Sequence, residues 1–245
     1  PYVERALETL RHGREMLSGV ETASAGRLQI ASARVICTYV LPEILQRFHS
    51  LHPGIEVSIK TGRSSEVLEM VLSEEAEVGL GRALVHPQMD ALHLYDEQIV
   101  LVTHPHHAFA LKGEASIYEV AQQPLILYDR GSTYFVLVNR ICREAEIAPR
   151  VEMELDSVEA TKRMIEEGLG VSFLPRNSIR RELSLGTLAE IRIKEGYQVR
   201  LPTSAMVRRA DGQGAIVGAF FSVLRELFSG QAEAASGPQV KVITP

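Results

Sequence analysis

Residues 26–53, GRLQIASARVICTYVLPEILQRFHSLHP, combine a short strand, a tight turn and an amphipathic helix. Leu28 and Ile30 alternate with polar neighbours, which is the period-2 pattern of a strand. The small residues that follow form a turn, and apolar residues then recur at helical spacing from Val40 to Phe48. A helix that begins in this way leaves backbone N–H groups without partners, and such groups attract anions. The stretch therefore predicts α/β structure with a candidate anion site at the turn.

The same pattern recurs twice along the chain. In residues 55–74 the strand IEVSIKT meets a turn at 62–65, and a helix follows. In residues 124–147 the strand PLILYD meets a turn at 130–133 before another helix. Three such turns predict one polar pocket assembled from several helix starts, which is typical of a protein that binds a small ligand.

The composition favours one large hydrophobic core or two smaller ones. The chain has 245 residues, of which 45% are hydrophobic. Its formal net charge of −5 argues against a nucleic-acid-binding surface, because such surfaces are usually basic. No apolar run reaches the roughly 18 residues of a membrane span, and no export signal opens the chain. We therefore expect a cytoplasmic protein.

The two cysteines, Cys37 and Cys142, both fall on apolar helical stretches. Buried, reduced thiols are the favoured interpretation, in keeping with a reducing compartment. A disulfide and a redox-sensing role for Cys37 are the alternatives.

Alternating strands and helices after residue 26 predict parallel sheets flanked by helices. Two similar blocks, at 26–100 and 124–175, indicate two sheets rather than one. We expect an α/β protein with two Rossmann-like lobes joined by two crossing strands. The predicted segments are a linker helix at 1–25, subdomain I at 26–100 plus 205–230, subdomain II at 101–204, and a flexible tail at 231–245.

Individual elements follow from the same patterns. Helices are predicted over 36–51, 65–74 and 132–145. The stretch THPHHAFALKG, 103–113, is expected to be a loop, and residues 176–197 show no regular pattern.

The first 25 residues carry a seam of apolar residues at heptad-like spacing. Val3, Leu7, Leu10 and Leu17 form the seam, and Arg14 interrupts it. A dimerising coiled coil is the favoured interpretation, and a helix packed on its own domain is the alternative.

Five blocks of sequence, in this order and spacing, resemble the effector-binding region of LysR-type transcriptional regulators. They are GRLQIASA…YVLPEILQRFHSLHPGIEVSIKTG at 26–62, EVLEMVLSEEAEVGLG at 66–81, DEQIVLVTHPHHAFA at 96–110, PLILYDRGST at 124–133 and VEMELDSVEATKRMIEEGLGVSFLP at 151–175. The resemblance implies a fold similar to type 2 periplasmic binding proteins. It also implies a bacterial transcription factor whose winged helix-turn-helix domain precedes Pro1.

The resemblance further implies a homodimer or homotetramer. In such assemblies the helices at 36–51 and 133–145 of neighbouring subunits would meet. DNA would be bound only through the preceding domain, and no membrane partner is expected. The residues expected at the dimer interface are Val3, Leu7, Leu10, Leu17, Ile44, Phe48, Val138 and Cys142.

The three turns supply most of the residues expected to bind the effector. Arginine presents a planar fork suited to carboxylate or phosphate, and glycine permits close approach of the backbone. Ser32 is expected both to cap its helix and to contact the ligand. Solvated arginines and ordinary helix caps are the alternatives. The expected effector-binding residues are Ser32, Ala33, Arg34, Gly62, Arg63, Ser64, Arg130, Gly131, Ser132 and Thr133, with Arg82 on the resemblance and Val171 at the expected cleft edge.

Neither a metal, a cofactor nor a catalytic role is expected. His104, His106 and His107 have no cysteine or carboxylate beside them at ligand spacing, so a solvated loop is favoured. Catalytic Ser–His–acid sets and glycine-rich phosphate fingerprints are missing. We expect a sensing domain that binds a small anionic metabolite, a carboxylate or other anion, between its lobes. The alternatives are a solute-binding protein of a transporter and an enzyme with the same two-lobed fold.

Overall fold

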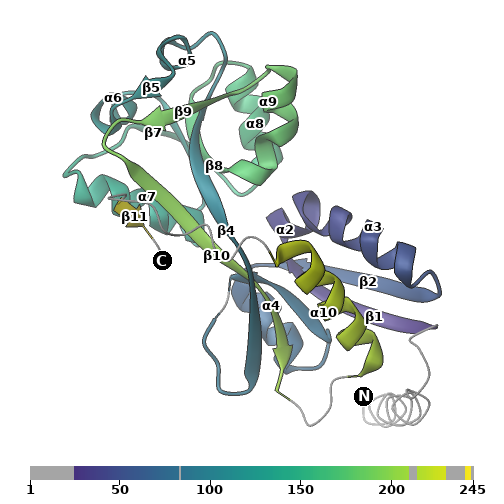
Figure 1. Ribbon diagram of the computed structural model, residues 1–245. Coiled ribbons are helices and arrows are strands. Elements are labelled where there is room, and N and C mark those ends of the chain that lie inside the picture. Colours follow the sequence, from purple (N-terminus) through teal and green to yellow (C-terminus); the bar gives the residue numbers. More distant parts are fainter. Residues whose placement is uncertain (1–24, 83, 210–213, 230–240, 244–245) are drawn as a thin grey trace. The chain divides into compact units, whose positions relative to one another are not determined.

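The computed structural model describes residues 25–82, 84–209, 214–229 and 241–243 (Figure 1). The chain divides into two compact units, and the described part crosses between them after Tyr95 and after Pro202. The predicted linker helix lies outside the described residues, apart from residue 25, and so do Val3, Leu7, Leu10 and Leu17. Most of the predicted tail also lies outside them.

Unit 1 is built on three parallel strands, β1 (Gly26–Ala33), β2 (Ile55–Gly62) and β3 (Val78–Arg82). β1 pairs with β2 along its whole length and with β3 on its other side. The C-terminal part of β10 (Tyr197–Arg208) pairs with β3 in the antiparallel direction. The helices of this unit are α2 (Arg34–Tyr39), α3 (Leu41–Leu51), α4 (Ser64–Leu72) and α10 (Ala215–Phe228).

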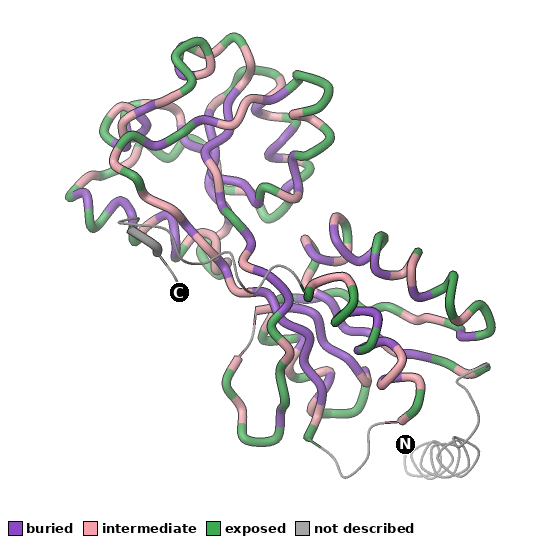
Figure 2. The backbone as a smooth tube through the Cα atoms, viewed as in Figure 1, coloured by how far each residue is buried: buried purple, intermediate pink, exposed green. Residues whose placement is uncertain are grey.

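The two faces of the β1 strand belong to two hydrophobic clusters. Leu28 and Ile30 pack with residues of α3 and α10, where Phe48 meets Phe220 edge-on at 5.2 Å between ring centroids. Ala31 faces the opposite way and packs with residues of α4. Figure 2 shows β3 and the second half of β1 largely buried, whereas most of the edge strand β2 is exposed or half-buried. The period-2 pattern thus fills both sides of the sheet, as expected for strands covered on both faces.

Unit 2 is built on the C-terminal part of β4 (Met89–Thr103) with β8 (Val171–Pro175), β6 (Leu125–Tyr128) and β7 (Val151–Leu155). β6 is parallel to both β7 and β8, and β4 is antiparallel to β8. β9 (Ala189–Ile193) pairs with β4 and with β5 (Glu114–Ala115), and β11 (Lys241–Ile243) pairs with the N-terminal part of β10. The helices are α5 (Ala108–Lys112), α6 (Ile117–Ala121), α7 (Thr133–Glu144), α8 (Val158–Glu166), η1 (Arg176–Ile179) and α9 (Arg180–Leu185).

Several sequence-based expectations need correction. The helix expected at 36–51 is two helices that divide at Val40, because Pro42 lacks an N–H and cannot continue α2. The expected loop at 103–113 contains α5, and the stretch 176–197 contains η1, α9 and β9. The hydrogen-bonded strands follow one continuous order, β2-β1-β3-β10-β4-β8-β6-β7, rather than two separate sheets. The reason is that β4 and β10 each run through both units.

A buried carboxylate joins β4 to η1 just beyond the first crossing. Glu97 is only 4% exposed, and its two oxygens accept hydrogen bonds from the backbone N and the Nδ2 of Asn177, at 3.2 and 2.5 Å. Burial raises the pKa of Glu97, although the Asn177 donors and the charge of Arg180 oppose the shift. The folded chain therefore binds a proton at this carboxyl more tightly than the unfolded chain does.

This shift predicts a pH-dependent effect of Glu97→Gln. In the wild type, the Glu97 carboxyl contributes most to the free energy of unfolding below its ordinary pKa of 4.5. This contribution is lost as the pH rises above that value toward the raised pKa of the folded protein. The amide does not titrate, so the free energy of unfolding of the variant, minus that of the wild type, should increase from pH 4.5 to pH 7. Urea unfolding at a series of pH values measures this difference. Glu43→Gln, at an exposed position of α3, is the matched control; a flat or decreasing difference for Glu97→Gln would contradict the assignment.

Candidate functional site

The ends of the three parallel strands of unit 1 lie level with one another. Ala33 at the end of β1 pairs with Gly62 at the end of β2, and Ser32 pairs with Leu80, two residues before the end of β3. The turns that follow these strands therefore emerge at the same edge of the sheet. All seven expected binding residues of this unit lie at that edge: Ser32, Ala33, Arg34, Gly62, Arg63, Ser64 and Arg82.

The first turn differs in detail from the expectation. Ser32 is fully buried at the end of β1, and its hydroxyl donates to the carbonyl of Ala33 at 3.2 Å. Ala33, which has no capping side chain, occupies the N-cap position of α2. The expected capping role of Ser32 is therefore wrong, because the residue lies one position too early in the chain. Arg34 begins α2 and is exposed.

The second turn is held by its own helix. Glu66 reaches back so that its Oε2 accepts a hydrogen bond from the backbone N of Arg63 at 2.6 Å. A Cβ at Gly62 would lie 2.7 Å from the same carboxylate oxygen, so a larger residue there would displace Glu66 from this hydrogen bond. The Ser64 hydroxyl accepts a hydrogen bond from the backbone N of Arg82 at 3.2 Å, which ties this turn to the end of β3.

Arg82 carries a buried hydrogen-bond donor that is not paired at this edge. Its Nε is shielded from solvent and has no hydrogen-bond partner among the described residues. Leaving a buried donor unpaired costs roughly 1–3 kcal/mol, and more for a charged group. A ligand acceptor at this position would remove that cost, so Arg82 is a stronger candidate than the exposed Arg34 and Arg63.

The third turn follows β6 at the edge of unit 2. Asp129 accepts a hydrogen bond from the backbone N of Gly131 at 3.1 Å, and Ser132 caps α7 by accepting from the N of Tyr134 at 3.0 Å. Arg130 is largely exposed and pairs with Glu154 of β7 at 3.2 Å. Thus the cap alternative holds for Ser132, although capping does not exclude contact with a ligand.

Tyr128 is a candidate that the sequence pattern concealed. It is the last residue of β6 and is 8% exposed, and its hydroxyl has no hydrogen-bond partner among the described residues. Its ring lies against that of Tyr134, with centroids 5.0 Å apart. Burial, with the nearby carboxylates of Asp129, Asp156 and Glu159, raises the pKa of Tyr128, so the phenol is a neutral donor. In the sequence LILYD, Tyr128 resembles the last apolar residue of a strand. Only its position just before the turn suggests that its hydroxyl could contact a ligand.

Val171 does not belong with these turn residues. It begins β8, is 1% exposed, and pairs with Leu125 at the start of β6. Parallel strands begin at one edge and end at the other, so Val171 lies at the opposite edge from Tyr128. The expectation that it lines the binding edge is wrong.

Four residues expected at a dimer interface also lie elsewhere. Ile44, Phe48, Val138 and Cys142 are all at most 5% exposed and pack in the cores of their own units. An amphipathic helix turns its apolar stripe toward its own sheet first. These four side chains are therefore not exposed for contact with a partner.

Histidines and cysteines have structural explanations. The Nδ1 of His104 accepts from the backbone N of His106 at 3.1 Å, and His107 caps α5 by accepting from the N of Phe109 at 3.2 Å. Over the described ranges, no group of three or more His, Cys, Asp or Glu residues is arranged to hold a metal ion. Burial raises the pKa of the Cys37 and Cys142 thiols, which disfavours the reactive thiolate. No described helix combines the length and apolar character needed to cross a membrane.

Comparison with known proteins decides the family. The family model described as "LysR substrate binding domain" matches residues 21–229. The chain belongs to this family. Among its relatives in Bacillus subtilis (strain 168) are two HTH-type transcriptional regulators. GltR is 28% identical over 211 residues, which are 86% of this chain and 69% of GltR. CitR is 31% identical over 185 residues, which are 75% of this chain and 63% of CitR. This LysR-family chain thus spans about two thirds of the length of these regulators.

A solved structure agrees with the expected fold class. The effector-binding domain of QuiR in complex with shikimate superposes with a TM-score of 0.72 at 16% identity, covering 84% of this chain and 98% of that one. The prediction of an α/β protein similar to type 2 periplasmic binding proteins, with two lobes joined by crossing strands, is confirmed.

The unpaired hydroxyl of Tyr128 generates a prediction for the unliganded protein. Tyr128→Phe removes a buried donor that has no described partner, so the free energy of unfolding should stay unchanged or rise by up to about 1 kcal/mol. Urea unfolding measures it. Thr161→Val is the contrasting variant, because the Thr161 hydroxyl donates to the carbonyl of Ser157 at 3.0 Å and its loss should destabilise. A loss above about 1 kcal/mol in Tyr128→Phe would show that the hydroxyl already has a partner.

Proposed function

We propose that this chain is the effector-sensing and oligomerisation region of a LysR-type regulator, and that its effector is a small anion bound between the two units. The main support for an anionic effector is the Nε of Arg82, which is shielded from solvent and has no hydrogen-bond partner among the described residues. Arg82 lies at the edge where the turns of unit 1 emerge. A guanidinium with a free N–H suits a carboxylate or phosphate oxygen, because charge-assisted hydrogen bonds are roughly twice as strong as neutral ones.

Tyr128 supplies a complementary group from unit 2. Its neutral hydroxyl can donate to an anion without a charge of its own, and no described residue uses it. The QuiR domain is in complex with shikimate, which is a carboxylate, and this agrees with an anionic effector for a protein of the same fold. In the proposal, Arg82 is the group that unit 1 offers to the effector, and Tyr128 is the group that unit 2 offers.

Such a ligand would act by shifting an equilibrium between arrangements of the units. Because β4 and β10 cross from one unit to the other, they are the segments through which the units can move. An effector shifts the populations only as far as its affinities for the two arrangements differ. The chain's relatives are named as HTH-type transcriptional regulators, and this shift would alter DNA binding by the full-length protein.

Oligomerisation is the second part of the proposal. The exposed side of α3, which includes Pro42, Gln46 and His49, is available to a neighbouring subunit because the apolar side is occupied by the core. Sedimentation equilibrium over a range of concentrations tests for a dimer or tetramer.

The effector prediction is tested with Arg82→Gln. We expect carboxylates in a panel that includes shikimate, citrate and glutamate to raise the melting temperature of the wild type, since a ligand that binds only the folded state stabilises it. Titration calorimetry with the most stabilising carboxylate should show at least about a tenfold loss of affinity for Arg82→Gln, the expected cost of one charge-assisted hydrogen bond.

Arg27→Gln is the matched control. Arg27 is exposed near the start of β1, so it lies at the edge of the sheet opposite to Arg82 at the end of β3, and its replacement should leave the affinity unchanged. Equal affinity in wild type and Arg82→Gln, or stronger binding of uncharged amide analogues, would overturn the anion assignment.

A further inference from the structure

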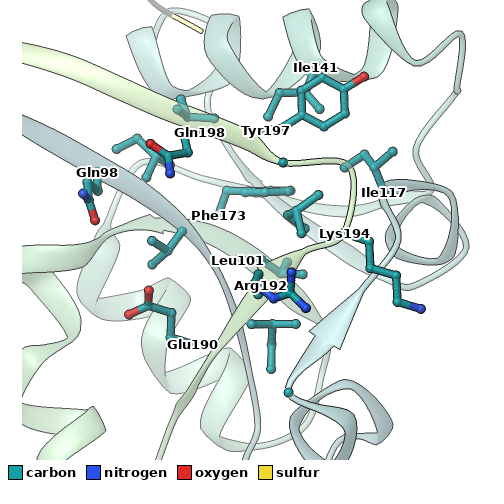
Figure 3. Close-up of a pocket in the computed structure, with 17 residues that line it drawn as sticks. Gln98, Leu101, Ile117, Ile141, Phe173, Glu190, Arg192, Lys194, Tyr197 and Gln198 are labelled. Atoms are coloured by element: carbon teal, nitrogen blue, oxygen red, sulfur yellow. The ribbon is translucent and has the colours of Figure 1, made fainter. Parts of the chain in front are cut away.

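Unit 2 contains a cavity of about 470 Å³ that is separate from the three turns (Figure 3). The residues that line it come from β4, β8, β9 and β10 and from the segments around α5, α6 and α7, all within residues 98–199. None of the expected effector-binding residues lines it. Its volume lies in the range of sites for small organic molecules, roughly 300–1,000 Å³.

The walls of this cavity are apolar where they meet the core of unit 2 and polar at the rim. Five isoleucines and one phenylalanine contribute to them, and each of these side chains is less than 10% exposed: Ile99, Ile117, Ile141, Ile191, Ile193 and Phe173. Leu101, Ile117 and Phe173 belong to the hydrophobic core of unit 2, and Figure 3 shows the amine of Lys194 directed away from them. A ligand that fills such a space is stabilised by about 25 cal/mol for each Å² of apolar surface removed from water.

The charged side chains at the rim already have partners of opposite charge. Arg192 forms an ion pair with Glu114, and Lys194 lies 3.6 Å from Glu119. Glu190 pairs with Arg176 at 2.9 Å. An ionic ligand seated against the isoleucines would have to bury its own charge, which is costly in an apolar site. The cavity therefore favours a neutral molecule.

We propose that unit 2 carries a second binding site, for a neutral and largely apolar small molecule about the size of a bicyclic aromatic. It differs from the proposed effector site in location, in residues and in ligand charge. Its walls include Ile99 and Val199, which lie on the two strands that continue into unit 1. Occupancy of the cavity thus bears directly on the strands through which the units are connected.

The experiment uses the full chain with carbon-13 in the isoleucine δ1-methyl groups, and indole as the neutral probe. Indole should shift the methyl signals of Ile99, Ile117, Ile141, Ile191 and Ile193. The signals of Ile30, Ile44 and Ile55 in the core of unit 1 should stay unchanged. The charged analogue indole-3-carboxylate should perturb the cavity methyls at least tenfold more weakly at equal concentration.

A blocking variant tests the location. Gln198 lines the cavity from a half-buried position of β10, so Gln198→Trp should fill the opening and abolish the indole-induced shifts. Gln46→Trp, at an exposed position of α3, is the matched control and should leave the shifts intact. Unchanged signals of Ile126, a buried residue of unit 2 that does not line the cavity, and of Ile44 in unit 1 report that both units stay folded.

Three results would overturn the proposal. The first is no shift of the cavity isoleucines at millimolar indole. The second is equal shifts of isoleucines in both units. The third is persistence of the shifts in a folded Gln198→Trp variant.

Discussion

The parallel pairing of β1 with β2 is the constraint on which the proposed effector site of unit 1 depends. Its register places Ala33 opposite Gly62, so two strand-to-helix turns leave the sheet at one level. Leu28 and Ile30 fix this register, because a slip of one residue would turn both side chains from the α3–α10 face to the opposite face. Hydrophobic burial in the sheet therefore determines where the polar groups of the edge can lie.

Polar groups at these edges are only partly satisfied by the fold. Glu66 and Ser64 accept hydrogen bonds from the backbone N–H groups of Arg63 and Arg82. These two donors are therefore already paired and do not require a ligand. The Nε of Arg82 and the hydroxyl of Tyr128, in contrast, have no hydrogen-bond partner within the described part of the chain. Buried polar groups are almost always hydrogen-bonded in folded proteins, so groups that are not are informative about binding.

Much of the fold follows from local sequence patterns, and much of the site does not. The strand at 26–33 and the turns after β2 and β6 were predictable, because period-2 alternation and small polar residues act locally. The division between α2 and α3 at Val40 could have been predicted from Pro42. It was missed because apolar residues continue at helical spacing on both sides of the proline.

Other features depend on tertiary contacts that one sequence does not encode in any local pattern. The apolar stripe of α3 gives no sign of whether Phe48 meets its own sheet or a partner, and the structure assigns it to the core against Phe220. Alternation identifies Val171 as a strand residue but does not say at which edge that strand begins. The shielding of Arg82 and the isoleucine-lined cavity arise only when distant segments pack together.

The two crossing strands give the units unequal connectivity along the chain. Unit 2 takes nearly all of its described structure from one uninterrupted stretch, 96–202, whereas unit 1 needs 203–229 to supply the end of β10 and α10. During synthesis the ribosome therefore releases a nearly complete unit 2 while the Phe48 face of unit 1 still lacks Phe220. Until α10 is available, this part of unit 1 exposes apolar surface, and such surface makes an incompletely folded chain prone to aggregate.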